Sequence, residues 1–234
     1  MVEKNRDPEW LAQERERQIQ RLVGRFVVDD DREVEGCNLH LVLGISKGEY
    51  IGSIPPLPPQ PEQWAGRFDV PILVDPRISL ITLLKLLEFM PAVDYWERAI
   101  KPYEGIGIPR NPYWVWIQNG DQHTDVSFLD WWKTKRARDE RGATIQEVLF
   151  LIYMQEGHLG TCLKAAPGSI APGESVPGAT LQRMPLVKPV RAIVAGRMIN
   201  TLGVFVVPIG TRDKDMGMAS CGDWTKIESA PRWH

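Results

Sequence analysis

Apolar side chains recur every three to four residues in three stretches of the chain, the spacing of one face of an α-helix. The first stretch follows Asp7 and Pro8, an N-cap residue and a proline at the first helical position. The last follows Thr144, which forms a Thr-x-x-Glu capping box with Glu147. The pattern predicts helices over residues 8–26, 79–89 and 145–154.

Other stretches have the period-two or short apolar pattern of β-strands. Residues 39–45 alternate apolar and small or polar side chains, and residues 113–120 form an aromatic run that ends in an Asn-Gly turn signal. Two apolar stretches near the carboxyl end flank a Gly-containing turn, which predicts a hairpin. The expected strands cover residues 39–45, 69–75, 113–118, 190–195 and 202–207, with further order over 216–224.

The order of these elements lacks the regular strand–helix alternation of a doubly wound sheet. It predicts an α+β fold with a mostly antiparallel sheet, a few packed helices and long Pro/Gly-rich loops. The longest of these loops is expected over residues 165–189, which contain five prolines and three glycines. We expect at most one short strand inside it.

A proline-rich segment interrupts the first third of the chain. Residues 54–61 contain five prolines, which fix φ and remove backbone donors, so we expect an extended polyproline II segment. It predicts a connector over residues 54–66 between an N-terminal region, 1–53, and a main α+β domain, 67–234. The alternatives are that residues 1–53 belong to the same compact domain, or that the prolines dock on an aromatic groove.

Composition narrows the class of protein. The 234 residues are 43% hydrophobic and 25% charged, as in a globular protein, and 28 basic against 30 acidic residues give a net charge of -2. There is no basic excess typical of a general nucleic-acid binder. Residues 1–25 lack the apolar core of a secretory signal, and no run reaches the roughly 18 apolar residues of a membrane span. We expect a cytoplasmic protein without a membrane segment.

Four short motifs follow one another between residues 91 and 224. They are residues 108–116 (Ile-Pro-Arg-Asn-Pro-Tyr-Trp-Val-Trp), 143–147 (Ala-Thr-Ile-Gln-Glu), 160–162 (Gly-Thr-Cys) and 218–222 (Met-Ala-Ser-Cys-Gly). In this order they resemble an uncharacterised family common in actinobacteria. Residues 204–215 depart from that family because they lack its Trp- and Gly-rich run. The resemblance implies a bacterial intracellular domain, and it assigns no catalytic residues because the family has no known activity.

Two groups of side chains could hold a metal. Cys37, His40, His158 and Cys162 give the four soft ligands of a structural zinc site, although Cys37 and His40 would face opposite sides of a regular strand. Asp29, Asp30, Asp31, Glu33 and Glu35 could bind Ca²⁺ or Mg²⁺, but they lack the usual loop pattern. Buried thiols and a solvated acidic turn explain both groups better, so we expect no cofactor.

A thiol nucleophile is the catalytic alternative. Cys221, within Ala-Ser-Cys-Gly-Asp-Trp, could attack a substrate with His123 as base, since His123 has aspartates on both sides. An inert buried cysteine is the simpler interpretation. The sequence contains no phosphate loop, dinucleotide fingerprint or His-Glu-x-x-His motif.

Aromatic and basic residues cluster in the middle of the chain. Aromatic faces next to cations are typical of surfaces that bind single-stranded nucleic acid or a protein. The alternative is that the tryptophans fill the core while the charges cover a helix face. The set is Trp114, Trp116, Trp131 and Trp132 with Lys133, Lys135, Arg136, Arg138 and Arg141.

These patterns predict a non-catalytic binding or accessory protein that uses this aromatic-rich surface and the polar helix at residues 8–26. A protein partner or a homo-oligomer is the expected partner, and single-stranded nucleic acid is a further candidate. The rival hypotheses are a thiol-dependent hydrolase or transferase that uses Cys221, and a structural subunit of a larger assembly.

Overall fold

The computed structural model describes residues 7–27, 33–86, 100–102, 107–118, 123–135, 139–155, 163–167, 169–170, 175–176, 179–180, 183–194 and 197–222. This part of the chain contains helices and mostly antiparallel sheets, which confirms the predicted α+β fold. None of its helices is long and apolar enough to cross a membrane.

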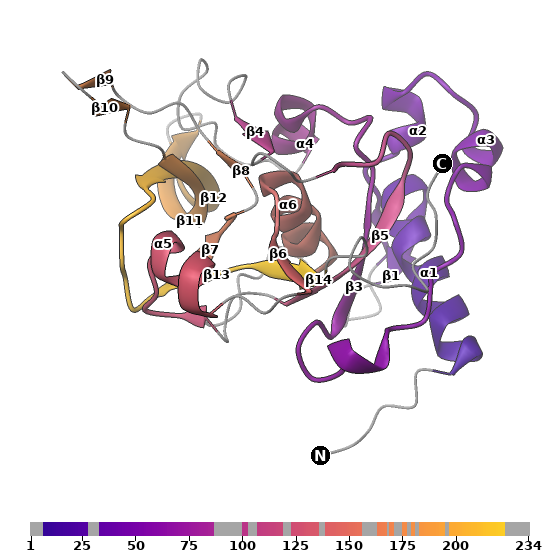
Figure 1. The fold of residues 1–234 in the computed structure, drawn as a ribbon. Helices are drawn as coiled ribbons and strands as arrows, with labels where there is room; N and C mark the ends of the chain where they lie inside the picture. The colour runs from indigo at the N-terminus through magenta and orange to yellow at the C-terminus, as the bar shows by residue number, and fades with distance from the viewer. Residues whose placement is uncertain are drawn as a thin grey trace.

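Helices and helical turns are interspersed with strands as far as α6, and the described elements after α6 are all strands (Figure 1). The helical elements are α1 (Pro8–Val23), α2 (Leu39–Val42), α3 (Lys47–Gly52), the 3₁₀ turn η1 (Glu62–Trp64), α4 (Leu80–Leu86), α5 (Phe128–Asp130), the π-helical turn η4 (Trp131–Lys135) and α6 (Ile145–Met154). The strands are β1 (Arg25–Val27), β2 (Glu33–Glu35), β3 (Val70–Val74), β4 (Lys101–Pro102), β5 (Tyr113–Gln118), β6 (Glu140–Gly142), β7 (Leu163–Ala165), β8 (Ser169–Ile170), β9 (Ser175–Val176), β10 (Ala179–Thr180), β11 (Arg183–Val194), β12 (Arg197–Pro208), β13 (Met216–Met218) and β14 (Ser220–Gly222).

A four-stranded antiparallel sheet of order β3-β5-β14-β6 carries the main hydrophobic core. The helix α6 packs on the face that contains Tyr113, since the Tyr113 hydroxyl bonds Glu147 of α6. The opposite face carries Trp114 and Trp116, whose indole N–H groups donate to the carbonyls of Pro55 and Pro58. Helix and proline-rich segment thus cover opposite faces of one sheet.

A second sheet of order β12-β11-β7-β13 is built on a long hairpin. The strands β11 and β12 pair in antiparallel register from Arg183↔Pro208 to Val194↔Arg197, which confirms the predicted hairpin and extends it. The pairing of β13 with β7 is parallel.

Ala219 joins the two sheets. It lies between β13 of the second sheet and β14 of the first, donates its N–H to Ala165 and accepts from the N–H of Ala143. Three residues further on, Gly222 lies directly against the indole ring of Trp64, and a Cβ at this position would clash with that ring. The Ala-Ser-Cys-Gly motif is therefore the crossing strand between the sheets.

Two predicted elements are wrong. Residues 39–45 do not form a strand, because Asn38, with φ of 52°, and Gly44, with φ of 67°, bracket the short helix α2. Residues 165–189 are not one loop, since they contain β8, β9, β10 and the first half of β11. The Pro185 carbonyl accepts from the Ala166 N–H, next to the short strand β7. The carbonyl and the ring nitrogen of a strand residue face the same side, so the missing N–H of Pro185 does not interrupt the hydrogen bonds between β11 and β12.

The proline-rich segment contributes to the main core. Ile54, Leu57 and Trp64 are buried in the same hydrophobic cluster as Ile19 of α1 and Cys221 of β14. The cluster therefore has members from all three regions that the sequence delimits, 1–53, 54–66 and 67–234. The division of the chain into separate domains stays a prediction.

Candidate functional site

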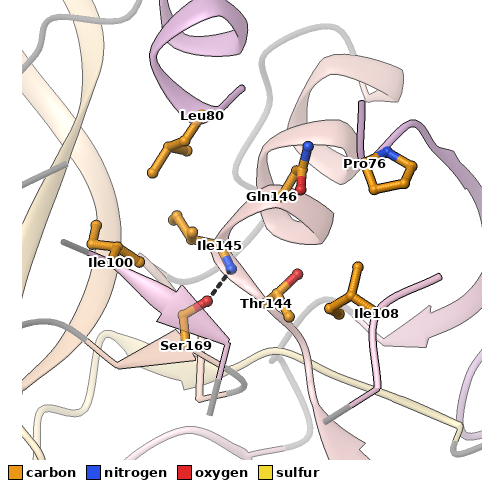
Figure 2. Close-up of a pocket in the computed structure, with 8 residues that line it drawn as sticks. All are labelled: Pro76, Leu80, Ile100, Ile108, Thr144, Ile145, Gln146 and Ser169. Carbon is orange, nitrogen blue, oxygen red and sulfur yellow. Dashed lines mark hydrogen bonds between the residues drawn. The ribbon is translucent and has the colours of Figure 1, made fainter. Parts of the chain in front are cut away.

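A pocket opens where α4, α6 and β8 converge (Figure 2). Its volume is about 160 Å³, and its walls are the apolar side chains of Pro76, Leu80, Ile100, Ile108 and Ile145. Thr144, Gln146 and Ser169 supply its polar atoms.

The polar residues of the pocket are held by the start of α6. Thr144 is the N-cap of this helix, and the predicted capping box with Glu147 is confirmed in both directions. The N–H of Ile145 donates to the Ser169 hydroxyl at 2.8 Å, which fixes Ser169 against the helix (Figure 2). The Gln146 amide N–H₂ donates to the carbonyls of Asp75 and Ile78.

A buried ion pair lies on the α6 side of β14. Arg141 and Glu147 are 2.6 Å apart, and the Tyr113 hydroxyl donates to Glu147 at 3.0 Å. Burial works against the charge of Glu147, but the Arg141 guanidinium and the hydrogen bonds from Thr144 and Tyr113 together outweigh burial and lower the pKa of this carboxyl. Burial and the Glu147 carboxylate both raise the pKa of Tyr113 well above its ordinary value.

A second polar network lies on the opposite side of β14. The Ser220 hydroxyl donates to Glu140, accepts from the Gln118 amide, and shares Glu140 with the His123 imidazole, whose Nε2 is 3.0 Å from the same carboxylate oxygen. Arg67 lies 3.8 Å from the other oxygen of Glu140. Because Glu140 bridges the hydroxyl and the imidazole, His123 does not contact Ser220 as a general base would.

The structure does not bring Cys221 and His123 together. Cys221 is opposite Arg141 in the register of β14 and β6, so it lies on the α6 face, whereas His123 bonds Glu140 on the other face. The Cys221 side chain is fully buried. The geometry that the thiol hypothesis requires is absent from this conformation of the described residues.

Three of the four predicted surface tryptophans are core residues. Trp114, Trp116 and Trp131 are fully buried, which overturns their assignment to an exposed surface. Trp132 is half-buried and Lys133 is exposed. Only the backbone of Lys135 is described, Arg136 and Arg138 lie outside the described residues, and Arg141 is bound to Glu147.

A smaller hydrophobic cluster reaches the surface next to Trp132. Its buried members include Phe128, Trp131 and Met216, and Trp132 stacks on Phe128 with ring centroids 5.7 Å apart. Partly exposed apolar side chains surround this cluster. We refer to four of them, Val126, Trp132, Val207 and Ile209, together with the exposed Leu129 of α5, as the second-core rim.

The polar N-terminal helix is bound to the rest of the chain through one face. Arg15 donates to the carbonyls of Ile54 and Pro55, and Arg21 donates to the Met154 carbonyl at the end of α6. On the outer face, Arg17 pairs with Glu14 at 2.6 Å. A role of this helix in partner binding stays a prediction.

The proposed metal ligands are not assembled among the described residues, which contain no cluster of three or more His, Cys, Asp or Glu side chains suited to a metal ion. Cys37 is beside Tyr153, and burial raises the pKa of its thiol. His158, Cys162 and Asp29 to Asp31 lie outside the described residues, and Glu33 and Glu35 are described only as backbone of β2.

Sequence reasoning missed the residues that line the pocket and those that form the network at Glu140. The capping box at Thr144 was a signal for the helix start beside the pocket. Nothing in the sequence places Ser169 or Glu140, because their partners come from distant segments.

No protein-family model, curated protein or solved structure matches this chain. The resemblance to an actinobacterial family therefore stays a prediction, and the functional argument rests on geometry.

Proposed function

We propose that the protein is a non-catalytic binding or accessory protein that docks a protein partner on the second-core rim. The observation that carries this proposal is the exposed apolar set around Trp132. Leu129 is 39% exposed, and Trp132, three residues further along the same helical segment, is half-buried. Half-buried tryptophans that stack on a core residue are typical anchors of protein interfaces.

The backbone at this place supports the same proposal. Trp132 and Lys133 lie in the π-helical turn η4, which follows directly on α5. Such turns are rare and occur often at functional sites. A charged pair, Asp130 with Arg212 at 2.6 Å, borders the apolar residues and gives the surface a polar edge.

A protein partner fits this surface better than single-stranded nucleic acid. Nucleic acid requires a track of cationic side chains next to the stacking rings. Of the predicted basic residues, the structure shows Lys133 exposed here, while Arg141 is occupied by Glu147 inside the protein. A second copy of the chain and a subunit of a larger assembly are both protein partners in this sense.

Site-specific photo-crosslinking in living cells tests the proposal. A photoreactive phenylalanine analogue replaces Leu129 in one variant and Leu41 in a matched control, since Leu41 is 68% exposed on α2. The proposal predicts a discrete crosslinked protein band from position 129 that is absent from position 41. No band from position 129, or a band that nuclease removes, would contradict it.

A further inference from the structure

The pocket at the start of α6 shares no residue with the second-core rim, so it is a separate candidate for ligand binding. Thr144 and Ser169 are each 4% exposed and both line it. Each hydroxyl oxygen already accepts a backbone N–H, from Glu147 and from Ile145. Neither hydroxyl proton has an acceptor among the described residues, so two buried donors remain for a ligand.

Gln146 adds an acceptor to the same pocket. Its N–H₂ group is used by the carbonyls of Asp75 and Ile78, which fixes the orientation of the amide. Its Oε1 atom receives no hydrogen bond within the described part of the chain. The pocket therefore presents two donors and one acceptor, a set that matches one carbonyl oxygen and one N–H group.

The described lining favours a neutral ligand over a charged one. None of the eight described residues that line the pocket has an ionisable side chain. A carboxylate or an ammonium group would be transferred from water without a counter-ion, which costs far more than the transfer of a hydrogen-bonded neutral group. The apolar walls favour a hydrocarbon body next to the polar head.

The volume limits the size of that body. About 160 Å³ is below the roughly 300–1,000 Å³ of pockets for drug-sized ligands. A dry cavity of about 150 Å³ in another protein holds one benzene molecule. One ring or one short branched alkyl group thus fills the pocket.

We infer that this pocket binds a small neutral primary carboxamide with a compact apolar body. The carbonyl oxygen accepts from Thr144 and Ser169, and the amide N–H donates to Gln146. The isoleucine and leucine side chains enclose the hydrocarbon part.

Titration of the ¹⁵N-labelled full chain with simple probes tests the inference. Benzamide and isobutyramide are compared with benzoate, isobutyrate and benzylamine, and the readout is the amide shifts of Ile145, Gln146 and Ser169. The inference predicts saturable shifts with an amide, and a dissociation constant for the matching acid or amine that is higher by at least about tenfold. Acids or amines that bind as tightly as the amides would overturn it, as would the absence of saturable shifts with both amides.

Two pairs of variants locate the binding. Thr144→Ser keeps the helix cap and the hydroxyl donor, whereas Thr144→Asp keeps the cap but replaces the donor by a charged acceptor. Amide affinity should be kept in the first variant and fall at least about tenfold in the second. Leu80→Trp fills the pocket from its partly exposed edge and should abolish the shifts, while Leu41→Trp on α2 should not.

If Thr144→Asp does not fold, the Leu80→Trp variant tests by itself whether the amide binds in the pocket. Unchanged amide binding in a folded Leu80→Trp protein would place the probe elsewhere and overturn the inference. Because the rim and the pocket share no residue, either result leaves the crosslinking test of the proposed function unaffected.

Discussion

Glu147 is the point where three buried groups meet. It caps its own helix, pairs with Arg141 and accepts from the Tyr113 hydroxyl. The capping box could be predicted from Thr144 and Glu147 because both partners are three residues apart. The bonds to Arg141 and Tyr113 could not, since they depend on how β5 and β6 flank β14 in the folded sheet.

We predict that Glu147→Gln lowers the free energy of unfolding by about 3–5 kcal/mol, because it leaves the buried Arg141 guanidinium without its counter-ion. Guanidinium chloride unfolding followed by circular dichroism measures the change. Glu16→Gln, on the exposed face of α1, is the control and should cost no more than about 0.5 kcal/mol. If both substitutions lowered the free energy of unfolding equally, the Arg141–Glu147 pair would contribute no specific stabilisation.

The same carboxyl predicts a pH dependence of stability. Arg141 lowers the pKa of Glu147 in the folded protein below its ordinary value of 4.5. Its stabilisation is therefore fully present above pH 4.5 and is lost as the pH falls through the folded pKa. The stability difference between the wild type and Glu147→Gln should shrink as the pH is lowered below 4.5, and a constant difference would contradict this account.

A side chain of α1 hydrogen-bonds the backbone of β3 at the edge of the main sheet. The amide of Gln18 in α1 donates to the Pro71 carbonyl at 2.7 Å and accepts the N–H of Leu73 at 2.8 Å. It therefore takes the place of a further strand along β3, which is the edge of its sheet. This contact explains why a polar residue is fully buried in the middle of α1.

We predict that Gln18→Ala destabilises the protein by about 1–3 kcal/mol, because the Leu73 N–H and the Pro71 carbonyl lose their buried partner. Gln13→Ala is the matched control, since Gln13 is exposed on the same helix and bonds only Glu9 among the described residues. Its effect should stay within about 0.5 kcal/mol. Chemical denaturation of both variants measures the difference, and a Gln18 effect as small as that of Gln13 would refute the edge-strand role.

The elements that the sequence predicts well are those whose ends have local signals. Asp7 accepts from the N–H of Trp10, which confirms the predicted cap, and Ser79 accepts from the N–H of Thr82 at the start of α4. The strand expected at residues 39–45 failed because the local turns at Asn38 and Gly44 dominate a short alternating pattern. The first half of β11 was missed because of its prolines. They face the side of the strand on which pairing is short, and only the tertiary arrangement shows this.

At the scale of the whole molecule, a main core and a smaller second core are joined through Ala219 between β13 and β14. Trp131 belongs to the interior of the second core and Trp132 to its rim. The sequence identifies both as neighbours in an aromatic cluster. It cannot say which of them is buried, because that depends on the π-helical turn and on the strands that pack against it.

We predict that Trp131→Ala lowers the free energy of unfolding by about 3–5 kcal/mol, because it empties a fully buried site. Trp132→Ala removes a half-buried ring and should cost about 1–2 kcal/mol. Thermal and chemical unfolding of the two single variants provide the comparison. Equal losses would mean that Trp132 is as much a core residue as Trp131, and would remove the anchor of the proposed interface.

The native mass of the protein in gently prepared cell extract tests the docking proposal most directly. Size-exclusion chromatography with light scattering, followed by mass spectrometry of what co-elutes, compares the wild type with Leu129→Asp and Leu41→Asp. We predict an assembly heavier than the 26.6 kDa chain that survives Leu41→Asp and is lost in folded Leu129→Asp. A wild-type protein that elutes at 26.6 kDa, or an assembly that both substitutions leave intact, would contradict the proposal.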